Sequence, residues 1–157
     1  MRNPEADAYL MIQDDVLFFN HNDLKNYLER TLWKTTEPCI ASLFCPRDYT
    51  QPKRGWFEFD GPWVWGAQAF VFSRSAAQLF LMDKEVVHHR WNERYEGMFG
   101  IDVLVGRWAN RCGVPIHYPT PSLVQHIGHV SAIWKRAHIS GARRADNFAG
   151  DLTDDEQ

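Results

Sequence analysis

Short apolar runs that alternate with segments of helical periodicity are the feature that most restricts the fold of this chain. Residues Ala8–Ile12 are apolar without interruption and residues 39–44 nearly so, which is typical of strands buried on both faces, as in parallel sheets. Apolar residues at helical spacing follow over residues 24–32, and a capping-box pattern at Ser75 opens another helix. Strands that alternate with helices predict an α/β fold.

The clearest expected helix spans Ile101–Cys112. Its apolar positions fall on one stripe, formed by Ile101, Leu104, Val105, Trp108, Ala109 and Cys112. Gly113 and Pro115 follow in the order that ends a helix, and extended segments are expected at residues 116–118 and 122–125. From residue 140 onward the chain is small and polar, so we expect one domain over residues 1–139 and a largely disordered tail over residues 140–157.

Composition and charge exclude several classes of function. An apolar fraction of 45% and seven tryptophans indicate a globular chain. The net charge is −3, and four acids lie in the last seven residues, so the remainder is close to neutral and predicts no nucleic-acid binding. The three cysteines lack metal-site spacing, and we find no signal peptide and no apolar run of about 18 residues, so we expect a cytoplasmic protein without a membrane span.

Two adjacent carboxylates, Asp14 and Asp15, follow the first expected strand and lie between apolar residues on both sides. Ligands of open α/β sheets bind beyond the carboxyl ends of strands. Two carboxylates become tolerable there if a divalent cation neutralises them, and hard oxygen ligands favour Mg²⁺ or Mn²⁺. The alternative is a turn or a helix cap, which often uses Asp after a strand.

Asp102 and His126 are two further candidates. Asp102 lies in the first turn of the expected helix, where the helix dipole stabilises a carboxylate. It could equally serve there as a general base, although the residue alone favours the structural interpretation. His126 ends an extended segment and could complete the coordination of an ion held by Asp15, with Mn²⁺ accepting nitrogen more readily than Mg²⁺. The alternative for His126 is a polar surface residue beside a turn.

Trp63 and Trp65 lie in a glycine-containing segment, residues 61–73. Two indoles could form a flat apolar wall for the face of a sugar ring, with Gly66 allowing close approach. Tryptophan is also a good core residue, and we favour the core for at least one of the two.

Three motifs occur in a fixed order: QDDV at residues 13–16, GIDV at residues 100–103 and PSLVQHIG at residues 121–128. Together with the tryptophan- and glycine-containing segment, they resemble the second half of a GT-A-type glycosyltransferase, most closely the N-acetylglucosaminyltransferase IV-like group. The resemblance covers residues 9–133, and PSLVQHIG is its most specific element. It implies metal-dependent transfer of a sugar from a nucleotide-diphosphate donor, a UDP-sugar, to an acceptor hydroxyl, with inversion at the anomeric carbon.

The resemblance also implies roles for individual residues. Asp15 and His126 would bind Mn²⁺ or Mg²⁺, which would neutralise the leaving diphosphate. Asp102 would take the proton from the acceptor hydroxyl. The residues implied to bind the donor or the acceptor are Gln13, Asp14, Trp65, Gly66 and Ala67.

The chain departs from the family pattern in ways that keep alternatives open. Gln13 replaces the usual first acid of the acidic motif. Few residues precede the first expected strand, so we expect a partial GT-A-like mixed sheet in which the N-terminal nucleotide-binding half is largely missing. The chain would then be a fragment, an enzyme that a separate chain completes, or a reduced form. The alternative functions are a non-catalytic carbohydrate- or partner-binding remnant of the fold and a metal-dependent hydrolase.

Overall fold

A computed structural model describes residues 5–19, 26, 28, 37–62, 64, 66–89, 100–128 and 143–151. Most of the helix expected over residues 24–32 therefore lies outside the described residues, as do Trp63 and Trp65. Within the described part of the chain, no helix is both long and apolar enough to span a bilayer.

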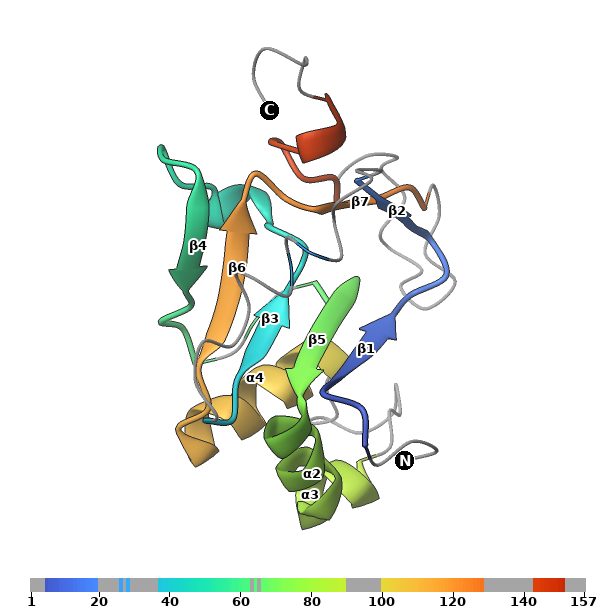
Figure 1. The fold of residues 1–157 in the computed structure, drawn as a ribbon, viewed down its shortest axis with the longest axis vertical. Coiled ribbons are helices and arrows are strands. Elements are labelled where there is room, and N and C mark those ends of the chain that lie inside the picture. Colours follow the sequence, from blue (N-terminus) through green and yellow to red (C-terminus); the bar gives the residue numbers. More distant parts are fainter. Residues whose placement is uncertain are drawn as a thin grey trace.

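A mixed sheet of five strands forms the centre of the molecule (Figure 1). The strands lie in the order β1, β5, β3, β6, β4. Neighbours pair antiparallel, except that β3 and β6 are parallel. The expected α/β fold class, a mixed sheet flanked by helices, is confirmed at this level. The strands are β1 Ala8–Ile12, β3 Ile40–Ser42, β4 Gly55–Glu58, β5 Ala69–Ser73 and β6 Ile116–Thr120.

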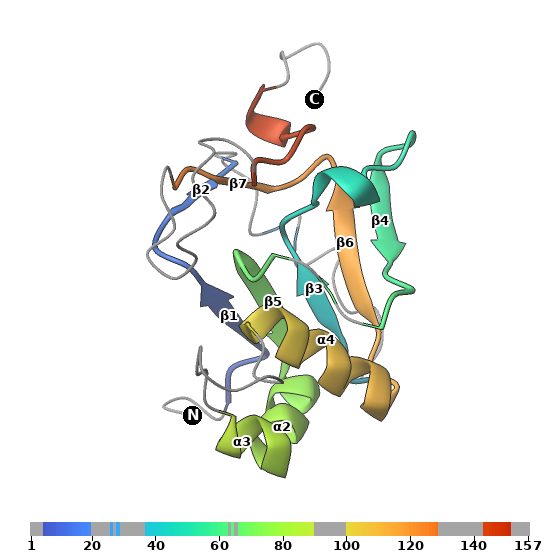
Figure 2. The same ribbon diagram turned by 180° about the vertical axis from the view of Figure 1, so that it is seen from behind.

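Alternating residues of the central strands enter two different core clusters. Ile40, Phe70 and Phe72 pack on one face with residues of α2, Arg74–Met82, and α4, Ile101–Cys112. In Figure 2, α4 crosses this face of the sheet, while α2 and the short α3, Lys84–His88, lie at its lower end. Trp108 of α4 is buried and meets the ring of Phe80 edge-on at 5.0 Å.

The opposite face of the sheet carries the second core cluster, against which Leu28, Val16 and Phe18 also pack. A small second sheet pairs β2, Val16–Phe18, with β7, Val124–His126. It lies at one end of the main sheet, beside the C-terminal segment 143–151 (Figure 1). Side chains from these parts join the second core cluster, which contains Ala41, Leu43, Phe44, Ala69, Val71, Leu123, Val124, Ala145 and Ala149.

The expectation that β1 is buried on both faces is wrong. β1 is an edge strand, and Leu10 and Ile12 are 52% and 48% exposed. Tyr9 and Met11, which alternate with them, pack on the core. An unbroken apolar run does not distinguish an edge strand from a central one, because the run says nothing of how many strands flank it.

The expectation of a disordered tail is wrong for residues 143–151. Ser122 forms a bridge with Phe148, and its backbone N–H donates to Asn147 O at 2.8 Å. Ala149 N donates back to Ser122 O at 2.9 Å, and Ala145 and Phe148 are buried. A segment with few apolar residues is held here mainly by hydrogen bonds, for which hydropathy gives no signal. A 3₁₀ turn, η2 Ala149–Asp151, ends it, and another, η1 Arg47–Tyr49, follows β3.

The helix boundaries are partly as expected. α4 spans Ile101–Cys112, and Gly113 ends it with a left-handed backbone, φ 66°. The capping box expected at Ser75 is wrong, because α2 begins at Arg74 and its N-cap lies two residues before Ser75. Ser73 is its N-cap, and the Ser73 hydroxyl accepts from Ala76 N at 3.2 Å and from Cys39 N at 3.1 Å. One hydroxyl thus caps α2 and joins the end of β5 to the start of β3.

Replacing Ser73 by alanine should lower the free energy of unfolding by about 2 kcal/mol, because two backbone N–H groups lose their acceptor. Ser75→Ala is the matched control and should cost less than about 0.5 kcal/mol. Urea denaturation of both variants measures the difference. A larger loss in Ser75→Ala would assign the cap to Ser75 instead.

Candidate active site

The pairing of β2 with β7 brings Asp15 and His126 together from opposite ends of the chain. Val16 lies opposite His126 in the register, and Ile127 N donates to Asp15 O at 2.9 Å. The residue before β2 and the last residue of β7 therefore become neighbours. Asp15 Oδ2 lies 3.0 Å from His126 Nε2.

This pair is partly withdrawn from solvent. The side chain of His126 is 12% exposed and that of Asp15 is 39% exposed. Asp15 Oδ1 is buried and has no hydrogen-bond partner among the described residues. A buried carboxylate oxygen without a partner is costly and uncommon in native structures.

Gly128, which the sequence analysis did not single out, gives the pair its space. A Cβ at this position would lie 2.5 Å from Asp15 Oδ2 and 3.1 Å from His126 Nε2. Any larger residue would push the pair apart. The signal was present in the sequence, as the glycine two residues after His126 in the QHIG motif.

The donor atoms of the pair fit a divalent cation. One carboxylate oxygen and one imidazole nitrogen suit Mn²⁺ well and Mg²⁺ less well. No group of three or more His, Cys, Asp or Glu side chains suited to a metal occurs among the described residues. The pair is therefore a partial site, and oxygens of a phosphate ligand and water would have to supply the remaining positions, as they do for Mg²⁺ in many phosphate-binding sites.

Asp102 is held by more than the helix dipole. Its Oδ1 accepts from Val103 N at 2.9 Å, and its Oδ2 accepts from Gly66 N at 3.2 Å. The second bond ties the first turn of α4 to the segment that leads into β5. Gly66 has φ 86°, and a Cβ there would meet Gln68 Oε1 at 2.5 Å and Phe44 Cδ1 at 2.8 Å. Conformation and space both favour glycine at this position.

Residues 66–69 join the two halves of the site. Gly66 N donates to Asp102, and Gln68 O accepts from Gln13 N at 2.9 Å. Gln13 comes directly after β1, two residues before Asp15. The acidic motif and the start of α4 are therefore linked through one short segment at the N-terminal end of β5.

The other predicted site residues lie as follows. Gln13 and Asp14 are exposed beside Asp15, and neither side chain takes part in the Asp15–His126 pair. Ala67 is buried in the core cluster under α4, so its methyl group contributes packing. Trp65 is outside the described residues, and the structure says nothing of its role.

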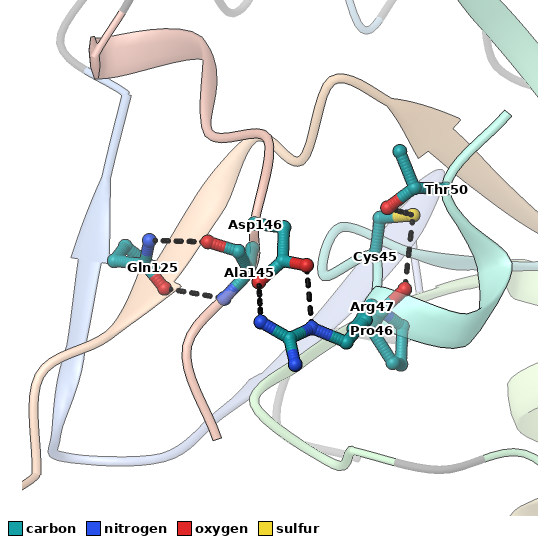
Figure 3. Close-up of polar contacts among 7 residues, drawn as sticks. All are labelled: Cys45, Pro46, Arg47, Thr50, Gln125, Ala145 and Asp146. Carbon is teal, nitrogen blue, oxygen red and sulfur yellow. Dashed lines mark hydrogen bonds and ion pairs between the residues drawn. The ribbon is translucent and has the colours of Figure 1, made fainter. Parts of the chain in front are cut away.

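Gln125 is a second residue that the sequence analysis missed. Its side chain is 1% exposed and bonds both backbone groups of Ala145 (Figure 3). Oε1 accepts from Ala145 N at 2.8 Å and Nε2 donates to Ala145 O at 3.1 Å. Oε1 also accepts from His126 N at 3.1 Å. Gln125 therefore anchors the C-terminal segment and fixes the backbone of His126.

A second link holds the same segment at the surface. Arg47 Nε and Nη2 donate to the two carboxylate oxygens of Asp146 at 2.5 and 3.0 Å (Figure 3). Both side chains are exposed, so solvent screening makes this pair the weaker anchor.

The two buried cysteines are poor candidates for a nucleophile. Burial raises the pKa of the Cys39 thiol and that of the Cys45 thiol. Side-chain hydrogen bonds with Ser73 for Cys39, and with Thr120 and Thr50 for Cys45, oppose this rise without cancelling it. Cys45 Sγ also donates to Pro46 O, and its contacts with Thr50 and Pro46 are drawn in Figure 3. Because the thiolate is the reactive form, both side chains remain unreactive thiols at neutral pH.

Comparison with protein-family models, with curated proteins and with solved structures finds no match to this chain. The glycosyltransferase resemblance therefore depends on the motif residues and on their arrangement. Chemistry at this site has to be argued from Asp15, His126, Asp102 and the groups that hold them.

Gln125→Met should lower the free energy of unfolding by about 2–4 kcal/mol, because the N–H and C=O of buried Ala145 both lose a partner. Asp146→Asn, which weakens the exposed anchor of the same segment, should cost clearly less. Thermal and urea denaturation compare the two variants. Equal losses would mean that the surface pair holds the segment.

Proposed function

We propose that this chain carries the metal-binding and acceptor-activating half of a GT-A-type glycosyltransferase. It transfers a sugar from a nucleotide-diphosphate donor, a UDP-sugar, to an acceptor hydroxyl, with inversion. The observation that carries the proposal is the pairing of Asp15 Oδ2 with His126 Nε2 at 3.0 Å beside a buried, unpartnered Asp15 Oδ1. The second support is Asp102, linked to the same end of the sheet through residues 66–69.

Asp15 and His126 would hold the cation. When bound, Mn²⁺ or Mg²⁺ supplies positive charge that neutralises the leaving diphosphate. The backbone bonds of Asp15 O to Ile127 N and of His126 N to Gln125 keep both ligands in place, and such supporting bonds affect metal affinity strongly. Gln13 and Asp14, exposed beside Asp15, are available to contact the donor.

Asp102 would act as the general base. Two backbone N–H groups donate to its carboxylate and hold it in place, and a carboxylate retains further lone pairs for a substrate proton. As the acceptor oxygen attacks the anomeric carbon, its proton passes to Asp102 and the bond from that carbon to the diphosphate oxygen breaks. Attack from the face opposite the diphosphate inverts the configuration.

Asp15→Ala should weaken Mn²⁺-dependent binding of UDP-sugars by at least about 100-fold, because loss of a supporting group alone costs 10–100-fold in metal affinity. His126→Gln should act in the same direction. Isothermal titration calorimetry with a panel of UDP-sugars, with Mn²⁺ or with EDTA, measures both. Glu58→Ala removes an exposed carboxylate on β4 and is the control for charge. Binding that ignores both Mn²⁺ and Asp15 would exclude this transferase and favour a non-catalytic binding protein.

Asp102→Asn should leave the affinity for the donor within about twofold and lower the rate of sugar transfer by about 10²–10⁴-fold, the contribution of a general base. Transfer from a UDP-sugar to a panel of p-nitrophenyl glycosides, followed by product and by UDP release, separates the two effects. A full transfer rate in this variant would leave Asp102 only its role at the start of α4. UDP release that no acceptor changes would indicate a hydrolase.

A further inference from the structure

Two buried glutamines lie near the site, and their hydrogen bonding differs. Gln125 uses both atoms of its amide group, as expected of a structural residue. Gln68 is 6% exposed, and its Oε1 is buried with no hydrogen-bond partner among the described residues. Native structures rarely leave such a group without a partner, and the exceptions call for a ligand or another functional reason.

Gln68 Oε1 lies near the carboxylate of Asp102. Gly66 lies between them: its N–H donates to Asp102 Oδ2 at 3.2 Å, and a Cβ on it would lie 2.5 Å from Gln68 Oε1. The two oxygens are therefore no more than about 8 Å apart across one glycine. Gly66 places no side chain between the two oxygens, and their separation is within the reach of one hexose residue.

The chemistry of the two groups selects the ligand. An amide oxygen only accepts hydrogen bonds, so its partner must be a donor. The carboxylate of Asp102 also accepts and repels anions, which argues against a phosphate or a carboxylate at this end of the site. A neutral ligand with several hydroxyl groups satisfies both oxygens.

We propose that Gln68 is a sugar-binding residue, whose Oε1 accepts a hydrogen bond from a carbohydrate hydroxyl that lies beside Asp102. This inference rests on the proposed function, which supplies the sugar. The hydroxyl belongs either to the donor sugar or to the acceptor, and the chemistry of the contact is the same for both.

Gln68→Met tests the proposal, because it keeps the length of the side chain and removes the acceptor. If Oε1 has no partner until a sugar binds, the melting temperature of Gln68→Met stays the same or rises. Gln125→Met is the matched control and should lower it, because that amide is fully bonded. A fall in Gln68→Met as large as that in Gln125→Met would make Gln68 structural and overturn the proposal.

Kinetics and binding identify the sugar. Gln68→Met should raise the KM for one substrate about 5–30-fold, the loss expected for one hydrogen bond to a neutral hydroxyl. UDP-sugars and p-nitrophenyl glycosides that lack single hydroxyls form the donor and the acceptor arm. For one deoxy analogue, either a donor or an acceptor, the KM of the variant should equal that of the wild type. If the variant's deficit persists with every analogue, or no deficit exists, the proposal falls.

A failure of the proposed function gives a different result. In that case the wild type shows no Mn²⁺-dependent binding of UDP-sugars, whatever residue occupies position 68. Gln68 is then judged by saturation-transfer NMR with methyl glycosides. Weaker binding to Gln68→Met than to wild type supports the proposal, and equal binding, or none to either protein, overturns it.

Discussion

The antiparallel pairing of β2 with β7 is the constraint on which the candidate site depends. It places Val16 opposite His126, and so brings Asp15 next to a histidine from the other end of the chain. A slip of one residue would turn His126 to the other face of the strand and separate the pair. The Gln125 side-chain amide stabilises this register, because it bonds both Ala145 in the C-terminal segment and the backbone N–H of His126. The geometry of the Asp15–His126 pair therefore depends on the C-terminal segment 143–151 as well as on the two strands.

Two unsatisfied oxygens show where this structure departs from the best local arrangement. Asp15 Oδ1 and Gln68 Oε1 are both buried without partners among the described residues, although their neighbours are well bonded. Functional sites commonly retain such groups at a cost in stability, since the missing partner is the ligand. Among the described residues, Trp56 Nε1 is also buried without a partner. Three other buried polar side chains are bonded: Ser73 caps α2, Ser122 accepts from Cys45 N, and Gln125 holds Ala145.

The sequence predicted the parts that local pattern controls. The helix Ile101–Cys112 was found to the residue, because its apolar stripe and Gly113 are local signals. The proximity of Asp15 and His126 followed from placing both after strands, but the order of the strands in the sheet had no local signal. The exposed edge of β1 was missed for that reason. Gln68 and Gln125 were missed because glutamine is common on surfaces, and only the fold buries these two and decides which of them is bonded.

The two carboxylates of the site have different hydrogen-bond partners, and this difference supports the roles proposed for them. Asp102 accepts hydrogen bonds from two backbone N–H groups and lies in the first turn of α4. The Asp15 side chain pairs with His126 and leaves Oδ1 without a partner among the described residues, which is consistent with the proposed cation. A general base must keep a lone pair for the proton, whereas a metal ligand donates it to the ion. In the proposed mechanism Asp15 binds the ion and Asp102 takes the proton, and the different hydrogen bonding of the two carboxylates supports this division.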